Sequence, residues 1–145
     1  MAESIPVILC GKTEAIGKTV IEALKPEFDV IHFITTTEAG EQQIPALLRG
    51  EKDSNNIPTT TIGSGNYDRG VGAVILGAGY DDQAVQQLRD AAAGLASVPW
   101  LRPDLGLPAP PLGPEYGRAL VARIKEMVGV LKAQGRMGAD AVVYY

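Results

Sequence analysis

Two glycines near the start of the chain, Gly11 and Gly17, give the first indication of chemistry. A short apolar run ends at Gly11, and an amphipathic helical pattern begins a few residues later. This order predicts a strand, a tight turn and a helix whose N-terminus faces the turn. The backbone N–H groups and partial positive charge of such a helix end suit a phosphate group. Lys12, Thr13 and Ile16 lie in the same turn, so they join the two glycines as candidate ligand-binding residues.

The turn also resembles the end of a P-loop, because Gly17 is followed by Lys18 and Thr19. That motif requires a glycine five residues before Gly17, where this chain has Lys12. Gly11 stands one residue too early, which changes the N–H groups that would meet a phosphate. No predicted strand ends in an acidic residue for magnesium, so the sequence does not favour a P-loop nucleotidase.

Further candidates follow the other predicted strands, because ligands of open α/β sheets bind at the carboxyl ends of the strands. We expect a ligand to meet residues there from several segments of the chain. These candidates are Thr35, Thr36, Gly77, Ala78, Gly79, Tyr80 and Arg102. Tyr80 would cover an aromatic ring of a ligand. Arg102 would either hold an anionic group or anchor the proline-rich segment that follows it.

A single histidine, His32, and a single cysteine, Cys10, are the remaining chemically active side chains. His32 lies inside a predicted strand, which favours a histidine facing solvent or a neighbouring helix over a metal ligand or a member of a catalytic triad. Cys10 precedes a helix N-terminus, which can lower the pKa of a thiol. A buried cysteine that packs as a small apolar residue is the stronger prediction. No set of residues predicts a metal site.

Apolar periodicity and turn residues predict alternating strands and helices. The predicted strands are Ile5–Cys10, Phe28–Ile34, Ala73–Leu76, Val98–Leu101 and Ala141–Tyr145. Four helices are predicted. The first begins near Ile16 and ends before Pro26, and the second runs from about Glu41 to Arg49. The third follows a cap at Asp81 or Asp82, and the fourth extends from about Pro114 to Gln134. Six prolines between Pro99 and Pro114 predict an irregular segment on the surface.

This alternation predicts one Rossmann-like domain over residues 1–145, a doubly wound parallel sheet of five or six strands in a three-layer α/β/α sandwich with right-handed crossovers. Residues 50–70 are polar and leave the strand order open. If Thr59 to Ile62 form an edge strand, the order is 3-2-1-4-5-6. If they form a loop, the order is 2-1-3-4-5, as in flavodoxin-like proteins.

Composition excludes several classes of function. The 145 residues carry a net charge of −4 and no cluster of lysines and arginines, so nucleic acid is not an expected partner. No apolar run reaches the roughly 20 residues that span a bilayer, and no leader pattern opens the chain, so no membrane partner is expected. One cysteine allows no intrachain disulfide, which is typical of a reducing compartment. We therefore expect a cytoplasmic protein.

The glycine turn resembles that of the NmrA-like and atypical short-chain dehydrogenase families, which reads roughly Gly-Ala-Thr-Gly-x-Ile-Gly. Gly11, Thr13, Ile16 and Gly17 match this pattern, and residues 73–79 look like the fourth strand of those families. The resemblance implies a Rossmann-like fold that binds NAD or NADP. Three threonines, rather than an acidic or basic residue, follow the second predicted strand, so neither cofactor is selected.

Two departures from the family pattern weaken the case for catalysis. Glu14 replaces the middle glycine, which places bulk and negative charge where a pyrophosphate would lie, at a cost of about 1–4 kcal/mol per nearby charge. No tyrosine is followed four residues later by lysine, the pair that passes a proton in short-chain dehydrogenases.

The sequence therefore predicts a minimal, non-catalytic relative of dinucleotide-binding domains with a regulatory or structural role. It is expected to form a homodimer through the proline segment and Tyr144–Tyr145. The alternative is an NAD(P)-binding, oxidoreductase-like enzyme or redox sensor that binds a phosphorylated ligand at Gly11–Gly17. A hydrolase or isomerase using Cys10 or Arg102 is a third hypothesis, for which the chain offers no complete catalytic set.

Overall fold

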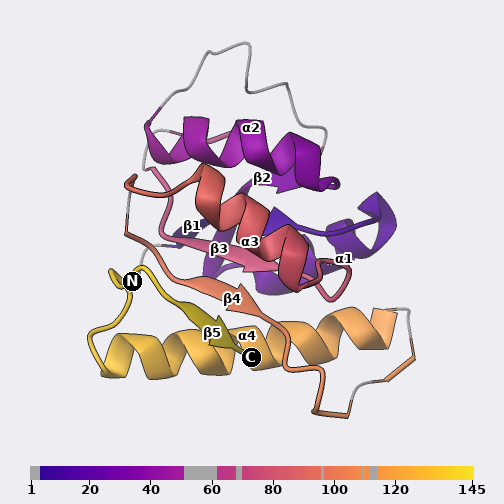
Figure 1. The fold of residues 1–145 in the computed structure, drawn as a ribbon. Coiled ribbons are helices and arrows are strands. Elements are labelled where there is room, and N and C mark those ends of the chain that lie inside the picture. Colours follow the sequence, from indigo (N-terminus) through magenta and orange to yellow (C-terminus); the bar gives the residue numbers. More distant parts are fainter. Residues whose placement is uncertain (1–3, 51–61, 68–69, 96, 109, 112–113) are drawn as a thin grey trace.

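A computed structural model describes residues 4–50, 62–67, 70–95, 97–108, 110–111 and 114–145 of the chain (Figure 1). The strands are β1 (Ile5–Cys10), β2 (Phe28–Ile34), β3 (Ala73–Leu76), β4 (Trp100–Arg102) and β5 (Val142–Tyr144). The helices are α1 (Glu14–Leu24), α2 (Thr37–Leu48), α3 (Asp82–Ala91) and α4 (Pro114–Ala133). None of these helices is long and apolar enough to cross a membrane.

The strands form one parallel sheet in the order β2-β1-β3-β4-β5. The α/β sandwich predicted from the sequence is thus confirmed, and the strand order is the second of the two alternatives. Thr59 to Thr61 lie outside the described residues, and Ile62 lies in a bend rather than in a strand.

The carboxyl ends of β1 and of its two neighbours in the sheet, β2 and β3, are level with one another. Cys10 at the end of β1 is paired with Ile34 of β2 and with Leu76 of β3. The backbone N–H of Gly11 donates to the carbonyl of Ile34 at 2.9 Å, and that of Gly77 donates to the carbonyl of Cys10 at 2.8 Å. The turns that follow these strands therefore meet at one edge of the sheet, where the chain reverses its direction across the sheet between β1 and β3.

A separate apolar cluster covers each face of the sheet. Helices α1 and α4 pack together on one face, with Leu24, Ile124 and Leu131 among the buried side chains. Helices α2 and α3 pack together on the other face, around Trp100 and Leu88. In Figure 1, α2 and α3 lie in front of the strands and α4 runs along the lower side of the sheet.

The connection from β4 through α4 to β5 has the opposite hand to the other three crossovers. The chain moves across the sheet in the same direction from β3 to β4 and from β4 to β5, yet α3 and α4 lie on opposite faces. The prediction of right-handed crossovers throughout is therefore wrong for this last unit. This crossover places α4 on the face that α1 covers, with residues 103–113 between β4 and α4 in the chain. As a result, α4 lies beside α1.

Capping side chains and strand pairing set the bounds of the elements, which differ from the prediction at α2 and β4. Helix α2 begins at Thr37 rather than near Glu41, because the hydroxyl of Thr36 accepts a hydrogen bond from the N–H of Ala39 at 3.1 Å. Asp81 caps α3 in the same way through the N–H of Ala84, at 2.8 Å. Strand β4 comprises residues 100–102 rather than 98–101, since only these pair with β3 or β5.

Candidate functional site

A cavity of about 400 Å³ opens at the edge of the sheet where β1 and β3 end, between α1 and α4. Eight of the residues singled out in the sequence line it. These are Gly11, Lys12, Thr13, Ile16, Gly17, Gly77, Ala78 and Gly79. The other lining residues come from β1, β2, the two helices and the end of the chain, and they are Leu9, Cys10, Val20, Phe33, Tyr116, Leu120, Ile124 and Tyr145.

Exposure separates the mouth of this cavity from its interior. Lys12, Thr13, Ala78 and Gly79 are exposed and form the mouth. The interior is walled by buried apolar side chains, Ile124 among them. The cavity is therefore polar at its opening and apolar within, as is usual for small-molecule sites of about 300–1,000 Å³.

Gly17 meets an aromatic ring rather than an open space for a phosphate. A methyl group at Gly17 would lie 2.6 Å from Cζ of Phe33, and one at Gly11 would lie 3.2 Å from the same atom. Phe33 projects from β2 and is 8% exposed. The two glycines of the turn thus allow the Phe33 ring to pack against the start of α1, which is the helix–strand packing role of the last glycine in such turns.

Lys12 is held at the mouth by the glycine-containing turn after β3. A methyl group at Gly79 would lie 2.5 Å from Cγ of Lys12, so the aliphatic part of the lysine occupies space that a larger residue would fill. The Lys12 ammonium lies 4.2 Å from the centroid of the Tyr80 ring, a cation–π contact. Within the described residues, no carboxylate forms an ion pair with Lys12. The turn therefore presents one positioned positive charge at the opening.

The remaining predicted site residues lie outside the cavity and support the fold. The Tyr80 hydroxyl donates to the carbonyls of Gly11 at 3.1 Å and Ile34 at 3.3 Å, and so ties the ends of β1 and β2. Burial raises the pKa of Tyr80, which keeps this hydroxyl protonated as a donor. Thr36 caps α2, and Thr35 precedes it without lining the cavity.

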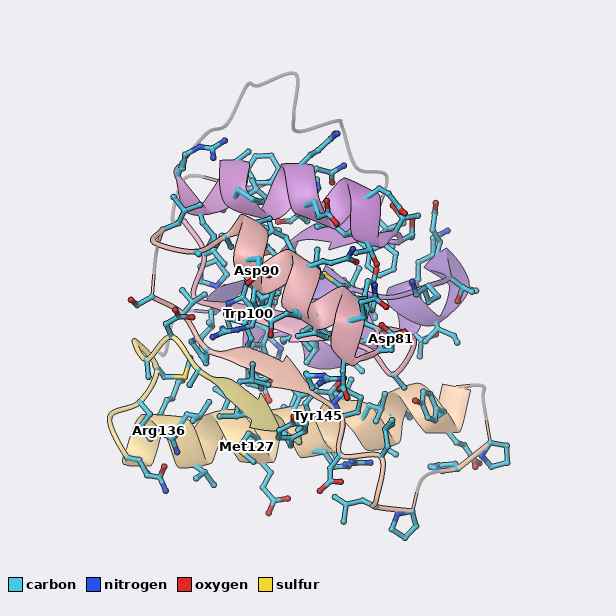
Figure 2. All side chains as sticks on the ribbon, viewed as in Figure 1. Asp81, Asp90, Trp100, Met127, Arg136 and Tyr145 are labelled. Carbon is cyan, nitrogen blue, oxygen red and sulfur yellow. The ribbon has the colours of Figure 1, made fainter. Side chains whose placement is uncertain are left out.

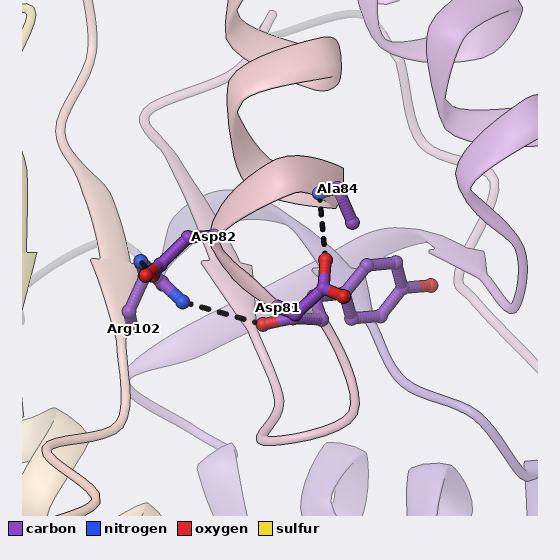
Figure 3. A network of polar contacts seen from close by, with 5 residues as sticks. Asp81, Asp82, Ala84 and Arg102 are labelled. Carbon is purple, nitrogen blue, oxygen red and sulfur yellow. Dashed lines mark hydrogen bonds and ion pairs between the residues drawn. The ribbon is translucent and has the colours of Figure 1, made fainter.

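Arg102 anchors β4 to the start of α3 (Figure 3). Its guanidinium donates to a carboxylate oxygen of Asp82 at 2.8 Å and to the carbonyl of Tyr80 at 3.3 Å. The Tyr144 ring centroid lies 5.8 Å from the same group. Arg102 thus pairs with a carboxylate of the protein.

The cavity's cysteine and its innermost tyrosine are held in their neutral forms. Burial raises the pKa of the Cys10 thiol to about 12, and the opposing effect of Lys12 is smaller. Burial also raises the pKa of Tyr145, with Tyr116 adding to the shift and Arg123 opposing it. The Tyr145 hydroxyl donates to the carbonyl of Leu76 at 2.6 Å. Figure 2 shows Tyr145 between β5 and α4.

His32 lies on the face of the sheet opposite to the cavity, where it connects β2 to α2 and to the segment that contains Tyr67. Its Nε2 is 2.6 Å from Oε1 of Gln43 on α2, and its Nδ1 is 2.8 Å from the hydroxyl of Tyr67. The amide oxygen can only accept, so the neutral ring donates from Nε2 and accepts from Tyr67. Burial lowers the pKa of His32, and the Gln43 hydrogen bond opposes this effect. Among the described residues, no group of three or more histidine, cysteine, aspartate or glutamate side chains is placed to bind a metal.

Glu14, the residue that departs from the dinucleotide pattern, is the first residue of α1 and is exposed. It is not among the residues that line the cavity. The helix end beside it is capped by Thr13, whose hydroxyl accepts from the N–H of Ile16 at 3.4 Å.

The three aromatic residues that line the cavity, Phe33, Tyr116 and Tyr145, were not predicted as site residues from the sequence. Tyr116 lies one helical turn before Leu120, which itself precedes Ile124 by one turn, so their spacing places all three on one face of α4. That spacing was a usable signal for Tyr116. The local sequence does not indicate that Phe33 and Tyr145 line the same cavity. Their placement depends on which face of the sheet the Phe33 side chain and helix α4 lie on.

The chain is 37% identical to the protein named kojic acid related protein 6 from Aspergillus oryzae (strain ATCC 42149 / RIB 40), over an alignment that covers 95% of this chain and 84% of the relative. No protein-family model matches the chain, and no solved structure matches it at a significant level. The chain belongs to the same family as kojic acid related protein 6.

Proposed function

We propose that this member of the kojic acid related protein 6 family is a non-catalytic regulatory protein that binds a small ligand in the cavity between α1 and α4. The observation that carries the proposal is the cavity itself, with its exposed mouth at the glycine turn and its apolar interior. Such a combination is the usual form of a small-molecule site. We place the protein in the cytoplasm, because its single cysteine suits a reducing compartment.

The lining residues support binding more than catalysis. The described residues that line the cavity include neither a histidine nor a carboxylate side chain, and these are the usual general bases of enzymes. The thiol of Cys10 is protonated at neutral pH, since its pKa is about 12. The hydroxyl of Tyr145 is already used as a donor to the backbone. The cavity walls can therefore enclose a ligand without supplying an evident proton acceptor.

Ligand binding would act on the rest of the molecule through α4. This helix forms one wall of the cavity, and its Arg123 donates to the backbone oxygens of Asp104 and Tyr145, at 3.1 and 2.7 Å. The segment after β4 carries Leu105, which is 74% exposed, and Leu107, which is 48% exposed. We propose that this exposed apolar segment and Tyr144 form the contact surface of a homodimer whose stability depends on the ligand.

A thermal melting screen tests the binding proposal. The panel contains kojic acid, because the relative's name refers to it, together with NAD, NADP, their reduced forms, FMN, ATP and small aromatic compounds. A ligand at a hundred times its dissociation constant stabilises the fold by about 2.7 kcal/mol, which raises the melting temperature by roughly 2–4 °C or more. A selective rise with a small aromatic compound supports the proposal. Binding that persists when Ala78→Phe narrows the mouth would contradict it.

The second candidate function is NAD(P) or phosphorylated-ligand binding at the glycine turn. Two observations favour it: Lys12 lies at the N-terminus of α1, and Glu14 is exposed and outside the cavity lining. Glu14→Gly would then strengthen binding of NADH or NADPH, because it removes a negative charge beside the phosphates. An unchanged melting temperature with every dinucleotide, for both the wild type and this variant, excludes this candidate.

A further inference from the structure

We infer that the cavity selects a planar aromatic acid, a ligand with a flat apolar body and one negatively charged group. This inference rests on the proposed binding function and adds the chemical class of the ligand. Two observations support the inference. The mouth of the cavity is polar whereas its interior is apolar, and Lys12 lies at the mouth.

The interior accepts a ring and disfavours a charge. Phe33, Tyr116 and Tyr145 contribute aromatic side chains to its walls, and aromatic rings pack favourably against one another in offset or edge-to-face geometry. The buried hydroxyl of Tyr145 already donates to Leu76. A charged group carried into this interior would lose its hydration without a compensating partner. The polar end of the ligand must therefore remain at the mouth.

The mouth offers one positive charge. Among the described residues that line the cavity, Lys12 is the only lysine or arginine. Its position over the Tyr80 ring, and its stem against Gly79, restrict the ammonium to one region before any ligand binds. Thr13 accepts from the N–H of Ile16, and its own hydroxyl proton can still be donated to an anion.

A single carboxylate suits this mouth better than a diphosphate. One lysine can pair with one negative charge, whereas the two charges of a pyrophosphate would require a second cation. The structure thus favours a monoanion whose ring enters between α1 and α4.

The test measures binding of 2-naphthoate, and of its neutral analogue 2-naphthalenemethanol, to the full chain by isothermal titration calorimetry at pH 7. We expect 2-naphthoate to bind about tenfold more tightly than the alcohol, since a hydrogen bond to a charged group contributes roughly one such factor. Lys12→Met should weaken 2-naphthoate about tenfold and leave the alcohol unchanged. Lys18→Met is the matched control, because it removes an exposed lysine of α1, the helix that follows Lys12, and this lysine does not line the cavity. It should change neither affinity.

Other outcomes separate failure of the ligand class from failure of the binding function. Equal affinities for the acid and the alcohol, or no effect of Lys12→Met, would overturn the aromatic-acid inference while leaving the cavity as a binding site. Octanoate binding as tightly as 2-naphthoate, or inorganic pyrophosphate competing with it, would overturn the inference in favour of an aliphatic acid or a phosphorylated ligand. Ala78→Phe should weaken both naphthyl compounds. If neither compound binds while another ligand of the melting panel does, the aromatic-acid inference alone is wrong. If no ligand of that panel binds either, or if both naphthyl compounds bind Ala78→Phe as well as the wild type, the proposed binding function itself is wrong.

Discussion

The two faces of the sheet are covered by similar apolar side chains, yet they use glycine for different ends. On the α2–α3 face, a methyl group at Gly40 would lie 2.5 Å from Cδ2 of Leu88, so the glycine lets two helices pack closely. On the α1–α4 face, Gly17 admits the ring of Phe33, and that ring forms part of a cavity wall. The role of each glycine therefore depends on the side chain that packs against it.

The path of the chain accounts for the difference between the faces. Helices α2 and α3 belong to consecutive crossovers of the same hand. Helix α4 reaches the opposite face after the long segment that follows β4, and it meets α1 from a distant part of the sequence. The cavity lies between these two helices, close to the turn that follows β1.

Loss of the largest side chain on the α2–α3 face should have the greatest effect. Trp100 is 2% exposed and lies on β4 under α3 (Figure 2). Trp100→Ala should lower the free energy of unfolding by about 3–5 kcal/mol, because it leaves a large void in a packed cluster. Urea denaturation measures this change. A loss below about 1 kcal/mol would show that this face is not tightly packed.

A matched pair of isoleucines compares the two faces directly. Ile44 on α2 and Ile124 on α4 are both almost completely buried, but only Ile124 borders the cavity. We expect Ile44→Ala to cost about 4 kcal/mol and Ile124→Ala about 2 kcal/mol, since a side chain beside an existing cavity has fewer neighbours to lose. Both values come from urea denaturation. Equal losses would contradict the difference in packing.

A double-mutant cycle tests the role of Gly17. Gly17→Ala should destabilise the fold by about 1–3 kcal/mol, because its methyl group would collide with Phe33. Phe33→Leu in the same chain should recover part of this loss, since the smaller side chain leaves room for the methyl group. Additive effects of the two substitutions would mean that Gly17 is required for some other reason than packing against Phe33.

The stability of the α2–α3 face should depend on pH through His32. Burial lowers the pKa of His32 below its usual 6.5, so the folded protein resists protonation more than the unfolded chain does. The contribution of His32 to the free energy of unfolding should therefore be constant above pH 6.5. It should decrease as the pH falls from 6.5 towards the pKa of His32 in the folded state. Urea denaturation at pH 7.5 and 5.5 measures the change. His32→Gln removes the only histidine, so a decrease of the same size in this variant would assign the effect to other groups.

The sequence was sufficient for the sheet and for half of the candidate site. A continuous apolar run predicts a buried strand such as Ala73–Leu76, and the spacing of the glycines predicts the turn from Gly11 to Gly17. The start of α2 could not be predicted, because any of several consecutive threonines could cap the helix. Only the folded chain shows that the Thr36 hydroxyl accepts the hydrogen bond from the N–H of Ala39.

The other half of the site depends on contacts between distant parts of the chain. Phe33 on β2 and Tyr145 after β5 are far apart in the sequence, and they line the same cavity because α4 lies on the face of α1. Tyr80 was expected to cover a ligand ring, and Arg102 either to hold an anionic group or to anchor the segment that follows it; each forms hydrogen bonds with the protein itself, at Gly11 and Asp82 respectively. Local spacing carries no information about such partners.

The most direct test of the binding proposal is an NMR titration of the isotope-labelled chain with 2-naphthoate. We expect the signals of Ile16, Gly17 and Ile124 to move with ligand concentration, whereas those of Leu88 and Trp100 on the other face stay in place. Unchanged spectra at millimolar ligand, or shifts centred on the α2–α3 face, would contradict the claim that the cavity between α1 and α4 is the ligand-binding site.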